Sequence, residues 1–227
     1  MENFAEIMAG LLQGFGTTCL LFSITLVFAL PLGLIISFGS MSKFKPLKYL
    51  IKLFVWVIRG TPLMLQILLV SFFPVLFNSQ TIIWAEKLNM TIKEMCFLYV
   101  SFAFIINYAC YFSEIYRSGI ESIPKGQYEA GEVLGMTKTQ IFFKIVLFQV
   151  FKRIVPPMSN EIITLVKDTS LAFTLTVIDL FTAAQEIANN TGLFAPILYA
   201  GVFYLLFNGL LSVLFSYIEK KMSFYKE

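Results

Sequence analysis

The sequence has no histidine and few charged residues, and both absences restrict what the protein can be. Only 14% of its 227 residues are charged, whereas soluble domains carry about a quarter. The mean hydropathy is +0.79. Without histidine, the chain lacks the usual general base and the most common metal ligand. The three cysteines (Cys19, Cys96 and Cys110) form no C-x-x-C pair, so we interpret them as small buried hydrophobic residues. We expect neither a catalytic site nor a metal site.

Charged residues are missing from four long stretches of the chain. These stretches lie between Glu6 and Lys43, between Arg59 and Glu86, between Glu94 and Glu114, and between Glu186 and Glu219. A helix needs about 20 mostly apolar residues to cross a bilayer, and only helices or closed barrels satisfy their backbone polar groups in lipid. The stretches lack the alternation of barrel strands. The sequence therefore predicts an all-α integral membrane protein.

We expect about five transmembrane helices, near residues 16–40, 53–77, 94–113, 154–175 and 193–217. The segments between and around them contain 0, 4, 2, 6, 0 and 3 lysines and arginines, in chain order. Because basic loops stay in the cytoplasm, this series predicts an N-terminus outside and a C-terminus inside. It also supports the fourth span, which contains charged residues of its own. No basic segment precedes the first apolar run, so we do not expect a cleaved signal peptide.

The third predicted loop, about residues 114–153, contains a short amphipathic helix. Pro124 and Gly126 end the preceding helix, the chain can restart at Gln127, and Gly135 is placed to end the new helix. Its apolar side would consist of Tyr128, Ala130, Val133 and Leu134, opposite the polar Glu129 and Glu132. Such a helix could dock into a groove on a partner protein, or it could pack on its own membrane domain. The residues alone leave both readings open.

The same loop resembles a known motif. Glu129-Ala130-Gly131, followed after three residues by Gly135, resembles the EAA loop of the permease subunits of bacterial ABC importers. Gly131 replaces a more common alanine, and Phe148 stands where a proline is usual. The resemblance implies a coupling helix that inserts into the ATPase subunit. The residues implied in coupling are Tyr128, Glu129, Ala130, Gly131, Leu134 and Gly135.

Three further segments resemble the polar amino acid importers of the histidine/glutamine type. They are RGTPLMLQ at 59–66, Asn160-Glu161 followed by KDTSL at 167–171, and the opening of the first span from Gly16 to Gly33. With the EAA loop, the resemblance covers about residues 14–217. It implies one transmembrane permease domain over 1–227, of the ABC type I importer kind, in a bacterial cytoplasmic membrane.

Two carboxylates of the fourth span are candidates for substrate binding. An ionisable residue within a span usually faces a cavity or a partner. Glu161 and Asp168 are seven residues apart and share one helix stripe, with Thr164 between them, and two carboxylates could receive the ammonium group of an amino acid. Alternatively, Lys167 neutralises them or pairs across a dimer interface.

Three other polar residues could contribute to the same site. Thr169 and Ser170 could donate hydroxyl groups to a ligand, or they could bond backbone carbonyls within the helix. Gln66 is a candidate for lining the transport path. Arg59, at the start of the second span, could extend to lipid headgroups or contact the third-loop region.

The sequence contains no G-x-x-x-x-G-K-[ST] phosphate loop, so we expect no ATPase site and no cofactor bound by this chain. The resemblance implies that ATP and Mg²⁺ bind a dimer of partner ATPase subunits. It also implies a solute-binding protein outside the membrane, an amino acid substrate and a second permease, identical or a sister chain. Membrane lipid surrounds the spans, and no nucleic acid partner is expected. A gradient-driven secondary transporter or another membrane protein is the alternative reading, and which amino acid is carried stays open.

Overall fold

The computed structural model describes residues 4–76 and 90–222, and within these ranges the chain is helical without strands. The α-helices are α1 (Phe4–Ser40), α2 (Lys45–Arg59), α3 (Leu63–Leu76), α5 (Ile92–Glu121), α6 (Lys125–Val133), α7 (Lys138–Ile141), α8 (Leu147–Asp168), α9 (Leu180–Thr191) and α10 (Ala195–Met222). A π-helical turn, η1 (Phe142–Val146), precedes α8, and a 3-10 helix, η2 (Thr169–Leu175), follows it. The predicted all-α class is confirmed.

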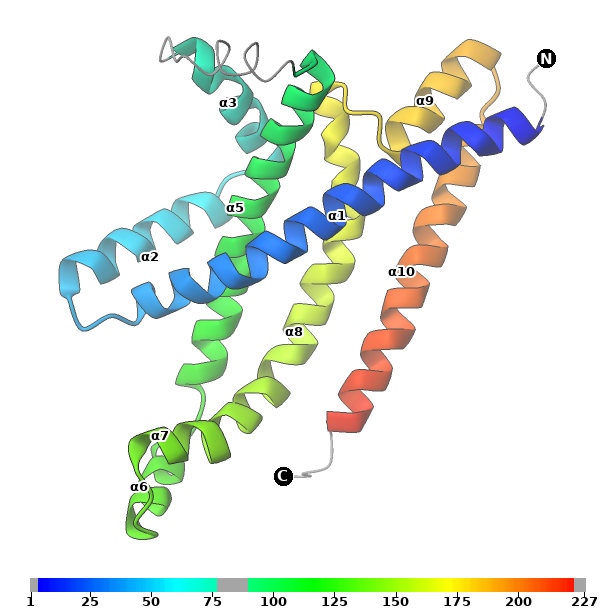
Figure 1. Cartoon of the computed structure of the whole chain (residues 1–227). Helices are drawn as coiled ribbons and strands as arrows, with labels where there is room; N and C mark the ends of the chain where they lie inside the picture. Colours follow the sequence, from blue (N-terminus) through cyan, green and yellow to red (C-terminus); the bar gives the residue numbers. More distant parts are fainter. Residues whose placement is uncertain (1–3, 77–89, 223–227) are drawn as a thin grey trace.

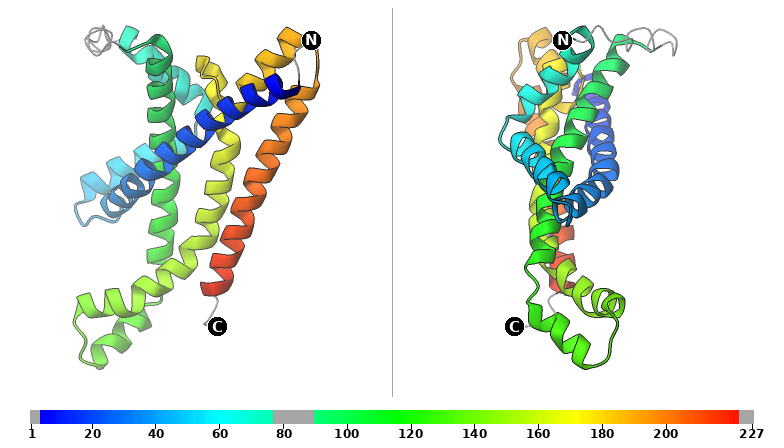
Figure 2. Two further views of the ribbon diagram at one scale, coloured as in Figure 1. Left: turned by 45° about the vertical axis from the view of Figure 1, so that its right-hand side comes forward. Right: turned by 90° about the vertical axis from the view of Figure 1, so that its left-hand side faces the viewer.

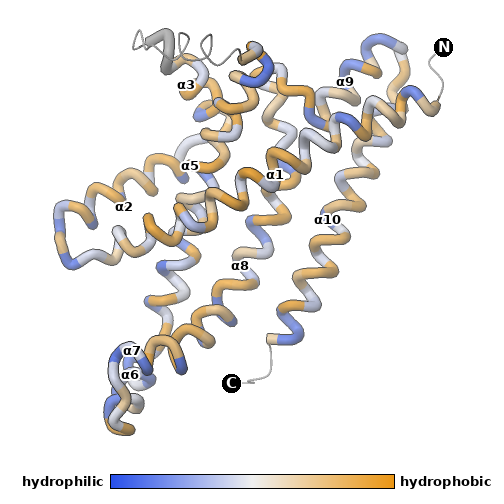
Figure 3. Tube along the Cα trace, in the orientation of Figure 1, coloured by the Kyte–Doolittle hydropathy of each residue, from blue (hydrophilic) through white to orange (hydrophobic). Residues whose placement is uncertain are grey.

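The long helices α5, α8 and α10 run along the length of the molecule, and α1 crosses them obliquely (Figure 1). Helices α6 and α7 lie at the same end as the end of α10, whereas α9 and the start of α1 lie at the opposite end (Figure 2). Apolar residues cover most of α1 and α10, and polar residues gather at α6 and α7 (Figure 3). One core joins α1, α3, α5, α8 and η2 around Phe104, Tyr108 and Phe112.

Within the part of the chain that the structure describes, three helices are each long and apolar enough to cross a membrane: α1, α5 and α10. Two bent pairs of helices raise the number to as many as five. The first pair is α2 with α3, and the second joins the segment Lys138–Leu175 to α9. This is the arrangement of a multi-pass membrane protein. The predicted number of spans and the predicted orientation of the termini stay predictions.

The expected second span, 53–77, is wrong as a single helix. Helices α2 and α3 meet at an angle of 107°, and residue 77 lies outside the described residues, as does most of the expected loop 78–93. The physical reason for the break lies at residues 60–62. Gly60 ends α2, its N–H donating to the carbonyl of Trp56, and Pro62 has no N–H to continue the helix. The hydroxyl of Thr61 donates to the carbonyl of Val57 at 3.0 Å.

The expected fourth loop, 176–192, is also corrected, because it contains helix α9. The carboxylate of Asp179 accepts hydrogen bonds from the N–H groups of Phe181 and Thr182 at the start of α9. Gly192 ends the helix with a φ of 69°, in the left-handed region that favours glycine. An aspartate before the helix and a glycine after it are ordinary cap signals. The sequence therefore contained the information for α9.

The short helix expected in the third loop is confirmed as α6, and Gly135 follows it with a φ of 72°. The exchange of alanine for Gly131 has a steric reason in this structure. A Cβ atom at position 131 would lie 2.6 Å from Cγ1 of Ile141, so glycine lets α6 pack closely on α7. Phe148 stands where a proline is usual in the family that the loop resembles. The helix in this region is irregular, because the π-helical turn ends at Val146, two residues before Phe148.

Glycine also permits a close approach between α1 and α5. A Cβ atom at Gly33 would lie 2.9 Å from the carbonyl oxygen of Ala109, whereas one at Gly16, on the same helix, would meet nothing within 4 Å. We expect Gly33→Ala to lower the free energy of unfolding by about 1–3 kcal/mol through overpacking. Gly16→Ala should leave it unchanged or raise it, since alanine favours a helix. Thermal unfolding of the purified chain in detergent measures both, and equal midpoints for the two variants would contradict this packing.

Candidate functional site

Three of the predicted substrate residues line one cavity of about 430 Å³. Glu161, Thr164 and Asp168 contribute from α8. The rest of the lining comes from the break between α2 and α3 (Thr61, Pro62 and Leu63), from α5 (Asn107, Tyr108 and Tyr111) and from Leu171. The volume lies within the range of about 300–1,000 Å³ that is typical of small-molecule sites. The cavity thus combines two carboxylates with polar and aromatic groups from two other elements.

Helical spacing explains how the side chains meet in this cavity. Residues 161, 164 and 168 follow each other by three and four positions, so they share one face of α8. On α5, Asn107 and Tyr111 are four positions apart and present the opposing face. The break before α3 brings the turn at Thr61 to the same place. A continuous helix over 53–77 would have no such turn.

The two carboxylates have different surroundings. The hydroxyl of Tyr108 donates a hydrogen bond to Oδ2 of Asp168 at 2.7 Å. Glu161 is half-buried and, among the described residues, has no hydrogen-bond or ion-pair partner. Lys167 is exposed and forms no ion pair with either carboxylate within the described part of the chain. Pairing of Lys167 across a dimer interface stays a prediction.

Gln66 does not belong to the lining of the cavity but to the helix break behind it. Its Nε2 atom donates to the carbonyl oxygens of Ile58, at 2.7 Å, and Thr61, at 3.1 Å. It also lies 2.9 Å from the hydroxyl of Thr61. Its Oε1 atom accepts a hydrogen bond from Nδ2 of Asn107 at 3.0 Å. Gln66 therefore holds the end of α2, the start of α3 and the middle of α5 together.

Thr169 and Ser170 use their hydroxyl groups within the helix. The hydroxyl of Thr169 donates to the carbonyl of Val166 at 2.7 Å, and that of Ser170 donates to the carbonyl of Lys167 at 2.8 Å. Thr169 is fully buried. The structure therefore favours the second of the two readings of these residues. It places neither of them in the lining of the cavity, and their role in substrate binding stays a prediction.

Sequence reasoning missed four residues that bring polar groups to the lining of the cavity: Thr61, Asn107, Tyr108 and Tyr111. Asn107 carried a usable signal, because it is an uncharged polar residue in the middle of an apolar span. The tyrosines carried none, since amphipathic aromatic side chains are ordinary components of membrane helices. Thr61 could be assigned to the cavity only from the structure, because it reaches the cavity through the break between α2 and α3.

Arg59 contacts protein groups beside the cavity, including Glu114 at the start of the expected third loop, and its extension to lipid headgroups stays a prediction. Its guanidinium carbon lies 5.0 Å from the ring centre of Tyr111, and Nη1 lies 3.7 Å from Oε2 of Glu114. Glu114 also pairs with Arg117 at 2.6 Å, and Arg117 pairs with Glu121 at 2.6 Å. These ion pairs run along α5 from the cavity to the start of the third loop.

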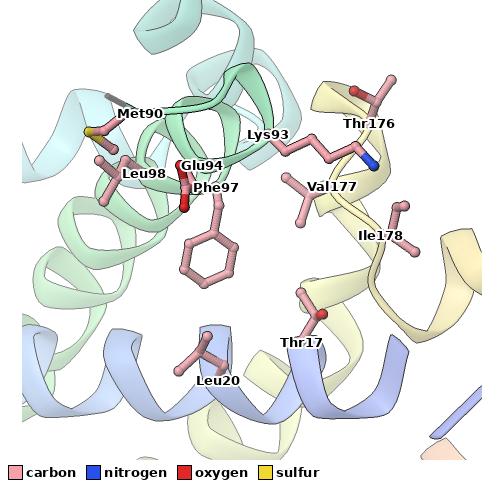
Figure 4. Close-up of a pocket in the computed structure, with 10 residues that line it drawn as sticks. All are labelled: Thr17, Leu20, Met90, Lys93, Glu94, Phe97, Leu98, Thr176, Val177 and Ile178. Carbon is pink, nitrogen blue, oxygen red and sulfur yellow. The ribbon is translucent and has the colours of Figure 1, made fainter. Parts of the chain in front are cut away.

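A second cavity, of about 590 Å³, lies between α1, the start of α5 and residues 176–178 (Figure 4). Phe97 points into it, and Lys93 extends from α5 toward the segment that carries Thr176. Its lining is mainly apolar. The carboxylate of Glu94 is already occupied as a helix cap, because it accepts a hydrogen bond from the N–H of Thr91 at 2.7 Å. This cavity contains none of the predicted substrate residues.

The predicted coupling residues lie on α6 and in the two positions after it, at the end of the molecule opposite α9. Glu129, Ala130 and Leu134 are exposed, Tyr128 is half-buried, and Gly131 is buried against Ile141. The apolar side chains of Val133 and Leu134 are 87% and 76% exposed, so an apolar surface is available to a partner.

The third loop is also anchored to α8. Nε2 of Gln149 donates to Oε1 of Gln127 at 3.0 Å. Nη1 of Arg153 donates to the carbonyl of Ser122 at 2.6 Å. These contacts join α6 and the end of α5 to the start of the helix that carries Glu161 and Asp168.

The chain belongs to the family described as binding-protein-dependent transport system inner membrane component, whose model matches residues 29–224. It is therefore a membrane component of a transport system that works with a binding protein. Its relatives narrow the class to amino acid permeases of ABC importers.

One such relative is the L-cystine transport system permease protein TcyB of Bacillus subtilis (strain 168). It is 35% identical over 99% of this chain and 90% of its own length. The putative glutamine transport system permease protein GlnP of Rickettsia conorii is 32% identical over 88% of this chain and 86% of its own. Among solved structures, an amino acid ABC transporter crystallised with histidines matches with a TM-score of 0.83 and 28% identity. That match covers 97% of this chain and 99% of the other.

Gln66 has hydrogen-bond partners within the protein, whereas Glu161 has none among the described residues, and this difference predicts different effects on stability. We expect Gln66→Leu to lower the free energy of unfolding by about 1–3 kcal/mol, because it leaves buried partners such as Asn107 unpaired. Glu161→Gln should leave stability unchanged or raise it, since it removes a charge without a partner from a membrane helix. Thermal unfolding in detergent tests both variants. A loss of stability in Glu161→Gln equal to that in Gln66→Leu would contradict this assignment.

Proposed function

We propose that this chain is the permease subunit of an ATP-driven importer, and that the cavity of Glu161, Thr164 and Asp168 is where an amino acid passes. The observation that carries the proposal is the pair of carboxylates on one stripe of α8, which line one cavity opposite the helix break. A cationic group of the substrate would bind between them by charge-assisted hydrogen bonds.

The chemistry of the cavity favours a polar amino acid, and a cationic one in particular. Two carboxylates exceed what one ammonium group needs, so a second positive group on the substrate would use both. Relatives named for cystine and for glutamine transport support an amino acid as the class of substrate.

The importer needs further subunits. We infer a dimer of ATPase subunits that binds ATP and Mg²⁺, a second permease and an extracytoplasmic solute-binding protein. We place this chain as one permease domain in the bacterial cytoplasmic membrane, with the third loop and the C-terminus inside. The family is binding-protein-dependent, so the gradient-driven transporter is not favoured.

The contacts of the third loop provide a route for coupling. Movement of α6 by the ATPase would reach the start of α8 through Gln127 and Gln149, and the end of α5 through Arg153 and Ser122. Both helices line the substrate cavity. ATP can drive transport only if it binds one conformation more tightly than the other, and α6 is the element through which we expect the two conformations to differ.

Removing either cavity carboxylate tests the substrate site. We expect Asp168→Asn and Glu161→Gln each to reduce uptake of a cationic amino acid by about tenfold or more, the equivalent of about 1.4 kcal/mol. Uptake by the reconstituted complex is measured across a panel of cationic, neutral and acidic amino acids. Glu186→Gln, an exposed carboxylate on α9, is the matched control. Wild-type uptake and selectivity in both cavity variants would remove the proposed site.

A charge on the exposed apolar end of the coupling helix tests ATPase docking. We expect Leu134→Glu to abolish co-purification of the ATPase with this chain, because a buried unpaired charge at an interface costs several kcal/mol. Leu193→Glu, an exposed leucine between α9 and α10 at the end of the molecule opposite α6, makes the same change elsewhere and should retain the ATPase. Normal co-purification with Leu134→Glu would show that this end of α6 does not dock.

A further inference from the structure

Helix α2 has three differently composed sides around its axis. Lys45, Lys48 and Lys52 recur at intervals of three and four residues and therefore form one stripe. On the inner side, Val55 is only 3% exposed. Of the exposed residues, Tyr49 and Trp56 lie next to the lysines, whereas the apolar residues Leu50, Leu53, Phe54 and Val57 lie farther round the helix.

The side chains on the exposed surface are large. Tyr49 and Trp56, seven residues apart, flank the lysine stripe and are 67% and 72% exposed. Leu50, Leu53 and Val57 lie beyond them, and they are also exposed. This is the order in which side chains occur from water to hydrocarbon at a membrane interface: lysine first, then tyrosine and tryptophan, then leucine and valine.

The orientation of α2 agrees with this order. It is bent by 107° from α3. It runs crosswise to α5 and α10, two of the three described helices suited to crossing the membrane, and alongside the end of the third, α1, which is itself oblique to the other two (Figures 1 and 2). Four residues separate its start from the end of α1, and it begins in the loop that the lysine count predicts to be cytoplasmic. A helix in this position would lie along the inner surface of the bilayer rather than through it.

We propose that α2 is an interfacial helix that binds anionic phospholipid. The lipid phosphates contact Lys45 and Lys48, the rings of Tyr49 and Trp56 lie at headgroup level, and the acyl chains cover Leu50, Leu53 and Val57. Lys52 contributes less, because its charge also acts on Glu114 of α5. This site goes beyond the proposed transport function and does not depend on it.

The occupant is a lipid rather than a second copy of α2. Between Glu6 and Glu86 the chain has no acidic residue, so α2 offers no negative group to another α2. A symmetric contact between two copies would place lysines against lysines, because such an interface pairs a surface with itself. Anionic headgroups supply the complementary charge, and hydrocarbon covers the apolar side.

Trp56 is a built-in reporter of this site. The chain has two tryptophans, so the full chain with Trp84→Phe carries Trp56 alone. This chain is placed in vesicles of phosphatidylcholine and phosphatidylglycerol in which either lipid is brominated near the headgroup end of its acyl chains. A lysine near an anionic surface favours lipid association by about fivefold. We therefore expect brominated phosphatidylglycerol to quench Trp56 at a mole fraction about fivefold lower than brominated phosphatidylcholine.

Charge variants distinguish a local lipid site on α2 from attraction of anionic lipid by the net positive charge of the chain. The pair Lys45→Gln and Lys48→Gln should remove the difference between the two lipids. The matched pair Lys138→Gln and Lys144→Gln, which removes two exposed lysines from the third loop, should retain it. Emission of Trp56 in vesicles without bromine checks that each variant is folded alike.

Three results would overturn the proposal. Equal quenching by both lipids would mean that α2 does not select anionic headgroups. No quenching by either lipid would mean that protein, such as a second copy, covers this side of the helix. Equal loss of selectivity in both lysine pairs would mean that net charge acts at long range without a site on α2. None of these measurements requires transport, so the result is independent of the importer proposal.

Discussion

The hydrogen bonds of Gln66 hold the break between α2 and α3, and much of the molecule depends on this break. Pro62 prevents the helix from continuing, but it does not by itself fix the direction of α3. Gln66 does so by bonding Ile58 and Thr61 on one side of the break and Asn107 of α5 on the other. The resulting bend forms one wall of the cavity that Glu161, Thr164 and Asp168 line. It also turns α2 away from α3, which gives α2 its position across the bundle.

Helix α5 is the element against which the other parts are positioned. Asn107 bonds Gln66, Tyr108 bonds Asp168 of α8, and Tyr111 lies beneath Arg59. On its opposite side, α1 approaches closely at Gly33. Polar residues on one face of α5 therefore fix the cavity, while small and apolar residues on another face pack against α1. Polar contacts of this kind are retained in membrane helices because an unpaired group in hydrocarbon is costly.

The sequence predicted the parts of the fold that depend on composition and local order. Charge-free stretches predicted membrane helices, and Pro124 and Gly135 predicted the bounds of α6. Helix α9 is predictable from its caps, Asp179 and Gly192, but its position between two apolar spans and its lack of lysine and arginine indicate only an extracytoplasmic loop. The angle at Pro62 was not predictable, since it depends on a hydrogen bond between residues 66 and 107, which are distant in sequence.

For the candidate site too, the sequence predicted what depends on local spacing and not what depends on contacts between distant residues. Glu161, Thr164 and Asp168 share a stripe that helical spacing alone predicts, and the cavity indeed joins them. Gln66, Thr169 and Ser170 have the same chemical groups as ligand-binding residues, but their hydrogen bonds are made within the protein. A single sequence does not show whether a polar group is already paired. The tyrosines of α5 enter the site only through packing of α5 on α8.

The unequal surroundings of the two carboxylates determine how a ligand would interact with them. Tyr108 already donates to Asp168, whereas no described group bonds Glu161. A charge without a partner is costly in a membrane helix, so a cation gains more by pairing with Glu161 than with Asp168, which keeps one hydrogen bond when the cavity is empty. In the proposed importer, Glu161 would therefore contribute most to the strength of binding. Asp168, fixed by Tyr108, would contribute most to the orientation of the substrate. Because Tyr108 lies on α5 and Asp168 on α8, a relative movement of these two helices would change the hydrogen bond between them. The third loop is anchored to both helices, so a movement of this loop in the proposed importer would act on the contact that orients Asp168.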